Sequence, residues 1–171
     1  ALTNKIRLMF ELCDWAWKYS SFTLQEKQWI FIQNILYGNP SPEDLANSIA
    51  LLSGILHDAT HRNVIILIDE YDVPLQSAFL HGYYDEMLTF LRTMMSSALK
   101  TNPYLERGMI TGCLRVSKES SLSGLNNVES HTIMSEGKRE FFGFEPAEVK
   151  EMLHYFDLDD AYPQFEYNYD G

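Results

Sequence analysis

One stretch of the sequence decides the fold: Val64-Ile-Ile-Leu-Ile-Asp-Glu-Tyr-Asp-Val-Pro74. Its first five residues, Val64–Ile68, are all aliphatic, and four of them are β-branched. An unbroken apolar run of this kind is typical of a central parallel strand that helices cover on both faces. An acidic turn, residues 69–72, follows the run directly and is closed by Pro74. The sequence therefore predicts an α/β fold with carboxylates at the C-terminal edge of a parallel sheet.

A second strand is predicted further along the chain. Apolar residues recur at helical spacing from Tyr84 to Ala98 and predict a long amphipathic helix that ends near Pro103. A short buried strand follows at 109–114, so strand, helix and strand form a βαβ unit with a right-handed crossover. Parallel strands end at the same edge of a sheet. We therefore expect Thr111 and Arg115 to lie beside the acidic turn.

The residue types at this edge suggest chemistry on a phosphate. Asp69 can hold Mg²⁺ through water, and Glu70 can polarise an attacking water. A cation is needed to offset charge that develops on a γ-phosphate, and Arg115 is the first candidate for this task and Lys118 the second. This is the Walker B arrangement. Two plainer interpretations stay open: a buried strand that leaves the core through a polar turn, and an internal salt bridge from Arg115 to Asp69 or Asp72.

The first third of the chain is predicted to be helical. Apolar residues at helical spacing predict one helix over residues 2–19. A capping box of Thr23 and Glu26 opens a second helix, which ends at Gly38, and Ser41 caps a third. We expect these helices to serve packing.

The last third is predicted to be more polar. A loop is expected at 115–127, a candidate third strand at His131–Met134, and a last helix from Pro146 to about Phe156. An aromatic and acidic tail follows this helix.

The charge, the cysteines and the length of the apolar stretches argue against several classes of function. The 171 residues contain 13 Lys and Arg against 24 Asp and Glu, which gives a formal net charge of −11. A surface with this charge is poorly suited to grip nucleic acid or anionic lipid nonspecifically. Cys13 and Cys113 match neither a metal spacing nor a disulfide framework, and no apolar stretch reaches the roughly 18 residues of a membrane span. We therefore expect a cytoplasmic protein whose residues here bind neither membrane nor nucleic acid directly.

The Walker B pattern is not accompanied by a Walker A phosphate-binding loop in this sequence. No G-x-x-x-x-G-K-[ST] occurs in the 171 residues, nor any other glycine-rich turn that could cradle phosphates with backbone N–H groups.

Four segments together resemble the bacterial AAA-ATPase-like family, whose members often carry a restriction-type PD-(D/E)XK nuclease domain further downstream. The resemblance spans roughly Ser41 to the end of the chain, and the second segment is its most specific part. The segments are Val64–Pro74, Thr111–Asn127, Phe141–Phe144 with the acidic helix after it, and Tyr169–Gly171.

The resemblance implies a P-loop ATPase core of the STAND and archaeal-ATPase type, with ATP and Mg²⁺ as cofactors of the parent protein. In such a core Asp69 would be the Mg²⁺ carboxylate, Glu70 the catalytic base, and Thr111 with Arg115 the sensor-like strand end, with Lys118 as a further contact to the nucleotide. We expect the parent to be an Mg-ATP-dependent switch or a slow ATPase.

The resemblance also implies a division of the chain. Residues 1–63 would be a helical insertion, 64–134 the Walker B and sensor part of the core, and 135–171 the start of a helical lid. The P-loop would lie upstream of Ala1, so we expect the sequence to be a fragment that is inactive alone.

Two alternatives from other classes remain. One is a degenerate ATPase fold that serves as a protein-interaction module, with the Tyr- and Phe-rich tail docking on a partner. The other is a metal-dependent nuclease site formed by Asp69, Glu70 and Asp72. The nuclease reading is disfavoured, because such sites usually have a Glu-x-Lys on a neighbouring strand, whereas Lys118-Glu119 has the reverse order and is expected in a loop.

Overall fold

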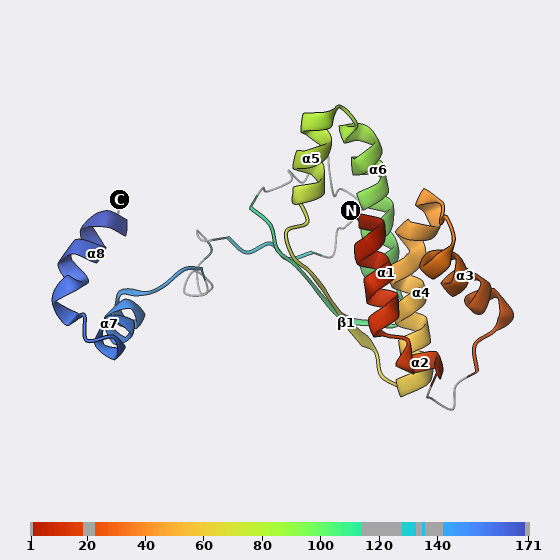
Figure 1. Cartoon of the computed structure of the whole chain (residues 1–171), viewed down its shortest axis with the longest axis horizontal. Helices are drawn as coiled ribbons and strands as arrows, with labels where there is room; N and C mark the ends of the chain where they lie inside the picture. Colours follow the sequence, from red (N-terminus) through yellow and green to blue (C-terminus); the bar gives the residue numbers. More distant parts are fainter. Residues whose placement is uncertain (1, 19–22, 114–127, 133–134, 136–141, 170–171) are drawn as a thin grey trace. The chain divides into compact units, whose positions relative to one another are not determined.

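The computed structural model describes residues 2–18, 23–113, 128–132, 135 and 142–169 (Figure 1). The chain divides into two compact units, residues 1–127 and 128–171. Each unit is described by itself.

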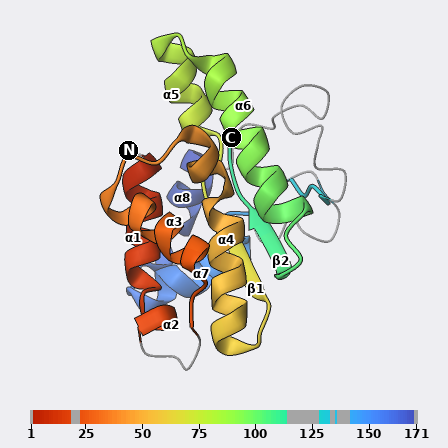
Figure 2. The same ribbon diagram turned by 90° about the vertical axis from the view of Figure 1, so that its right-hand side faces the viewer.

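The first unit is mixed helix and strand, which confirms the α/β class. Helices precede, separate and flank two strands in the order of the chain (Figures 1 and 2). The elements are α1 (Leu2–Leu12), α2 (Trp15–Lys18), α3 (Glu26–Tyr37), α4 (Pro42–Thr60), β1 (Val64–Ile68), α5 (Val73–His81), α6 (Tyr84–Met95), the π-helical turn η1 (Ser96–Lys100) and β2 (Leu105–Ile110).

Helix α4 is the central element of this unit. Ser41 caps it as predicted: the Ser41 Oγ accepts the Asp44 N–H at 3.1 Å, and Pro42 occupies the first turn. The helix contacts α1, α2, α3, α6, η1 and β1. Between α1–α3 and α4 lies the largest apolar core, formed by Ile6, Phe10, Ala16, Ile32, Ile35, Leu52 and Ile55.

Two helix boundaries near the N-terminus differ from the prediction. The expected single helix 2–19 is interrupted by a turn at Cys13 and Asp14, and the short α2 that follows the turn buries Ala16 completely. Helix α3 begins at Glu26, which is therefore too early in the helix to close a capping box with Thr23. The Gln28 side chain does this instead, because its Oε1 accepts the Gln25 N–H at 2.9 Å.

The two strands are parallel neighbours, as the βαβ reading predicted. Their register sets Ile66 opposite Gly108 and Ile68 opposite Ile110. Strand β2 runs from Leu105 to Ile110, four residues earlier than the predicted strand at 109–114. The apolar pattern did not indicate the start of β2, because Glu106 and Arg107 lie within the strand at exposed positions. The strand ends at Ile110, because its partner β1 ends at Ile68.

The connection between the strands is also more divided than predicted. Helix α5 forms directly after the acidic turn, and Gly82 ends it in the left-handed conformation, with φ +79°. The expected long helix from Tyr84 is α6 followed by the π-helical turn η1, in which the Thr101 N–H donates to the Ser96 carbonyl at 3.0 Å. Helices α4, α5 and α6 share a second core of Ala46, Leu75, Leu91 and Met94.

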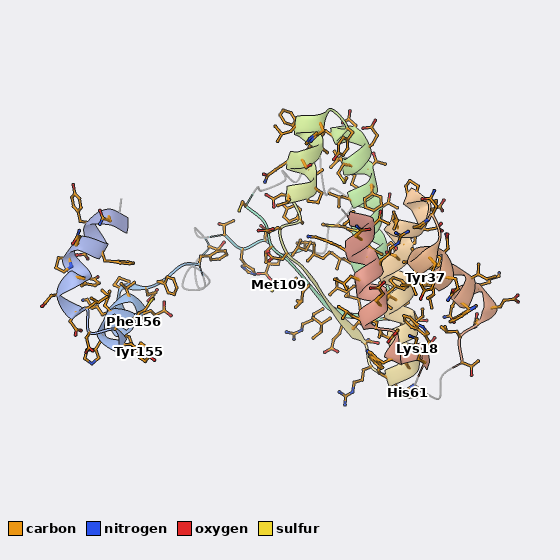
Figure 3. The ribbon with its side chains drawn as sticks, in the orientation of Figure 1. Lys18, Tyr37, His61, Met109, Tyr155 and Phe156 are labelled. Atoms are coloured by element: carbon orange, nitrogen blue, oxygen red, sulfur yellow. The ribbon has the colours of Figure 1, made fainter. Side chains whose placement is uncertain are left out.

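The two faces of the sheet differ. On one face Ile66 packs with Met95, Ala98 and Leu99. On the other face Ile65 and Leu67 are 61% and 72% exposed, and Met109, labelled in Figure 3, is 61% exposed. Within the described residues of the first unit, helices therefore cover one face of the sheet, and the expected cover of the other face is not found there. An aliphatic run indicates that its side chains favour burial, but it does not indicate which neighbouring element buries them.

The second unit contains α7 (Pro146–Tyr155), the 3₁₀ turn η3 (Asp159–Ala161) and α8 (Tyr162–Tyr169). Helix α7 matches the predicted last helix. His131 and Thr132 are not in a strand, contrary to the candidate strand at 131–134, whose residues 133 and 134 lie outside the described part. Among the helices that the structure describes in either unit, none has both the length and the apolar character needed to cross a bilayer.

Among the described residues, one face of the sheet is exposed and β1 is the one strand that pairs with β2, and both features predict self-association. Apolar strands with a free edge recruit other strands, and screening of the net charge of −11 by salt should favour this. Sedimentation velocity should show a mass that rises with protein concentration, and Leu67→Lys should lower it. The matched control is Phe79→Lys on α5, where the side chain is equally exposed, at 74%. Equal effects of both substitutions would contradict the prediction.

The two cysteines are expected to differ in reactivity. Burial raises the pKa of the Cys13 thiol, and the neighbouring Asp14 carboxylate raises it further, whereas Cys113 is exposed. Because the thiolate is the reactive form, the raised pKa of Cys13 lowers its reactive fraction near neutral pH, and this fraction grows as the pH rises. Mass spectrometry after brief alkylation at about pH 8 should find Cys113 modified first. Faster modification of Cys13 would contradict this.

Candidate functional site

The acidic turn lies immediately after β1 and before α5. Asp69 and Glu70 both have exposed side chains. Glu70 has a φ of +51°, in the left-handed region that non-glycine residues adopt at a cost of about 1 kcal/mol. The turn is closed by the Val73 N–H, which donates to the Glu70 carbonyl at 3.1 Å. This backbone sends the two adjacent carboxylates outward at the end of the strand.

Thr111, the first residue after β2, holds the turn through four hydrogen bonds. Its backbone N–H donates to the Ile68 carbonyl at 2.9 Å, and its carbonyl accepts the Tyr71 N–H at 3.0 Å. Its hydroxyl donates to Asp69 Oδ1 and accepts the Glu70 N–H at 3.4 Å. The parallel register carries Thr111 to this position, since Ile110 pairs with Ile68. The neighbouring strand thus fixes both the turn and one carboxylate oxygen.

Asp72 supports the turn from inside. It is 2% exposed, and its Oδ2 accepts the Gln76 Nε2 at 3.0 Å, one turn along α5. The Asp72 carbonyl also accepts the Gln76 N–H at 3.0 Å. A buried carboxylate is costly unless hydrogen bonds satisfy it, so Gln76 stabilises the start of α5 against the turn.

Gly112 permits close packing between the two strand ends. A Cβ at this position would lie 2.6 Å from Tyr71 Cε1 and 2.7 Å from Asp72 Oδ1, closer than real Cβ contacts. Glycine is therefore required for the end of β2 to approach the turn.

The structure brings together three of the five predicted site residues, Asp69, Glu70 and Thr111. Arg115 and Lys118 lie outside the described residues, so the cation at this edge stays a prediction. Sequence reasoning missed the supporting roles of Gln76 and Gly112, and the available signals were weak. They are the i, i+4 spacing of Asp72 and Gln76 at a helix start and the glycine directly after a strand.

The acidic turn can supply one carboxylate ligand to Mg²⁺. Mg²⁺ sites on nucleotides use one or two carboxylates together with water and phosphate oxygens. Within the described residues no protein group donates to Asp69 Oδ2, which is therefore open to such a cation or its water. No group of three or more His, Cys, Asp or Glu side chains gathers as a metal cage in that part of the chain. The turn fits the carboxylate half of an Mg-nucleotide site and contains no phosphate cradle.

The tight approach at Gly112 generates a stability prediction. Gly112→Ala should lower the free energy of unfolding by about 1–3 kcal/mol, because the added methyl group displaces the Tyr71 ring and the Asp72 carboxylate. Gly108→Ala is the control: its Cβ would meet only the Leu99 side chain, whose end can rotate away. Urea unfolding followed by circular dichroism should show the smaller loss for Gly108→Ala. The reverse order would contradict the packing argument.

Comparison with known proteins gives one match. No curated protein and no solved structure matched the chain. The family model described as "Predicted AAA-ATPase" matches residues 7–122. This range holds all five predicted site residues and also the N-terminal helices from Arg7, which the resemblance from Ser41 onward did not include. The match covers more than half of the sequence and includes the acidic turn and both strands, so the chain belongs to the predicted AAA-ATPase family, AAA-ATPase_like.

Proposed function

We propose that the acidic turn and the end of β2 are the Walker B and sensor elements of a P-loop ATPase domain. The observation that carries the proposal is the Thr111 hydroxyl, which contacts both the Asp69 carboxylate and the Glu70 backbone from a neighbouring parallel strand. In this arrangement a polar side chain at the end of one strand can respond to a change at the carboxylates that follow the neighbouring strand. A polar turn that merely carries a buried strand out of the core would not require this contact.

Each residue has a distinct task in the proposal. Asp69 binds Mg²⁺, directly or through water, with the oxygen that Thr111 does not occupy. Glu70 accepts a proton from the attacking water, and its exposed position beside Asp69 gives it access to that water. Arg115, with Lys118 as a second cation, offsets charge on the terminal phosphate. Mg²⁺ supplies charge neutralisation between the phosphates when the nucleotide is bound.

The proposal extends to the organisation of the protein. We assign residues 1–63 to a helical insertion, 64–134 to the Walker B and sensor part, and 135–171 to the start of a helical lid. The phosphate-binding loop would be supplied by sequence outside the 171 residues, since none of their glycines stands in a Walker A pattern. The assembled domain would act in the cytoplasm as an Mg-ATP-dependent switch or slow ATPase.

Substitutions in a protein that carries this sequence together with a phosphate-binding loop test the proposal. Glu70→Gln should retain nucleotide binding and slow hydrolysis by roughly 10²–10⁴, the contribution of a positioned general base. Asp69→Asn should raise the Mg²⁺ concentration needed for half-maximal turnover, and Arg115→Ala should lower turnover more than affinity. Calorimetry and a phosphate-release assay separate these effects.

Glu86→Gln on α6 is a matched control, since it changes an exposed glutamate outside the acidic turn. It should leave both binding and hydrolysis unchanged. Wild-type hydrolysis by all three site variants would overturn the assigned roles and favour the interaction module.

A further inference from the structure

The described part of the second unit buries few side chains. Among its described residues Val149 is the one buried side chain, although α7 and α8 are both formed. Segments of this size rarely fold without a staple or a partner surface, because they bury too little apolar area. Its large exposed apolar residues are Val128, Phe142, Phe144, Met152, Tyr155, Phe156, Leu158 and Tyr167.

Three of these residues lie at the C-terminal end of α7. Met152 and Tyr155 stand at positions i and i+3 of the helix, and Phe156 is the residue that ends it. The rings of Tyr155 and Phe156 meet edge to face at 5.0 Å and remain 81% and 63% exposed (Figure 3). We call Met152, Tyr155 and Phe156 the α7 aromatic face.

Two carboxylates precede this face on α7. Glu148 and Glu151 each precede a member of the face, Met152 and Tyr155 respectively, by one helical turn. Among the described residues Glu151 forms no ion pair. Lys150 is the only Lys or Arg in residues 142–169, against seven carboxylates: Glu145, Glu148, Glu151, Asp157, Asp159, Asp160 and Glu166.

The unit already shows how a cation binds its rings. The Lys150 Nζ lies 4.5 Å from the centroid of the Tyr162 ring, within the range of a cation–π interaction. Tyr155 and Phe156 offer the same kind of ring face, with carboxylates nearby, and have no such cation among the described residues.

We propose that the α7 aromatic face docks a basic amphipathic helix of a partner protein. Arg or Lys side chains of that helix stack on Tyr155 and Phe156 and pair with Glu151, while its apolar side chains cover Met152. A second copy of this chain would bring the same excess of carboxylates to the contact, and nucleic acid or an anionic membrane would be repelled by them. The proposal is independent of the ATPase function.

Fluorescence anisotropy with the 171-residue chain tests the proposal. The probe is a labelled amphipathic peptide of about 18 Arg and Leu residues, which is about five helical turns. We expect binding that weakens as NaCl rises from about 50 to 500 mM. The double substitution Tyr155→Ser with Phe156→Ser should weaken binding about tenfold or more, through loss of both rings. Glu151→Gln should weaken it less and flatten the salt dependence.

The matched control is Phe79→Ser with Leu80→Ser, which removes equally exposed apolar residues from α5 in the first unit. It should leave the affinity unchanged, and circular dichroism verifies that each variant retains its helices. Four results would each overturn the proposal: no binding of the peptide, equal losses in both double variants, tighter binding of RNA or anionic vesicles, or a chain dimer that the Tyr155 and Phe156 substitutions abolish.

Discussion

The parallel pairing of β1 with β2 is the constraint on which the candidate site depends. Asp69 and Thr111 are 42 positions apart in the sequence, and only the register that sets Ile68 opposite Ile110 brings them into hydrogen-bond contact. The pairing continues for one residue beyond the strands through the backbone of Thr111. The end of one strand thereby shapes the turn that follows the other.

Packing behind the sheet keeps this register in place. Ile66 lies against Met95, Ala98 and Leu99, and the Leu99 side chain fills the space that the missing Cβ of Gly108 leaves open. Below the turn, the buried Asp72 ties α5 to the strand end through Gln76. These contacts offset the cost of the left-handed Glu70, so the strain is located at the two carboxylates proposed to act.

The two units differ in how they satisfy their apolar residues. In the described part of the first unit there are three apolar clusters, in which helices cover one another and one face of the sheet. The second buries Val149 and leaves most of its aromatic side chains exposed among carboxylates. Both units therefore present apolar surface. That of the second lies in a segment, residues 142–169, with seven carboxylates and one Lys, and this charge excess favours the basic partner proposed above.

The sequence by itself determined the local features. The aliphatic run Val64–Ile68 specified a strand, Ser41 with Pro42 specified the start of α4, and the adjacent acids after the strand identified the candidate site. These signals are short-range and follow from the chemistry of neighbouring residues. For the same reason the predicted family could be recognised from a few segments.

Only the tertiary structure decided which residues meet. It placed β2 four residues earlier than its apolar pattern indicated, because pairing with β1 outweighs the polarity of Glu106 and Arg107. It buried Asp72, gave Gly112 its role and left Ile65 and Leu67 uncovered among the described residues. Burial and close approach depend on neighbours that are distant in sequence, and a periodic pattern contains no information about the identity of those neighbours.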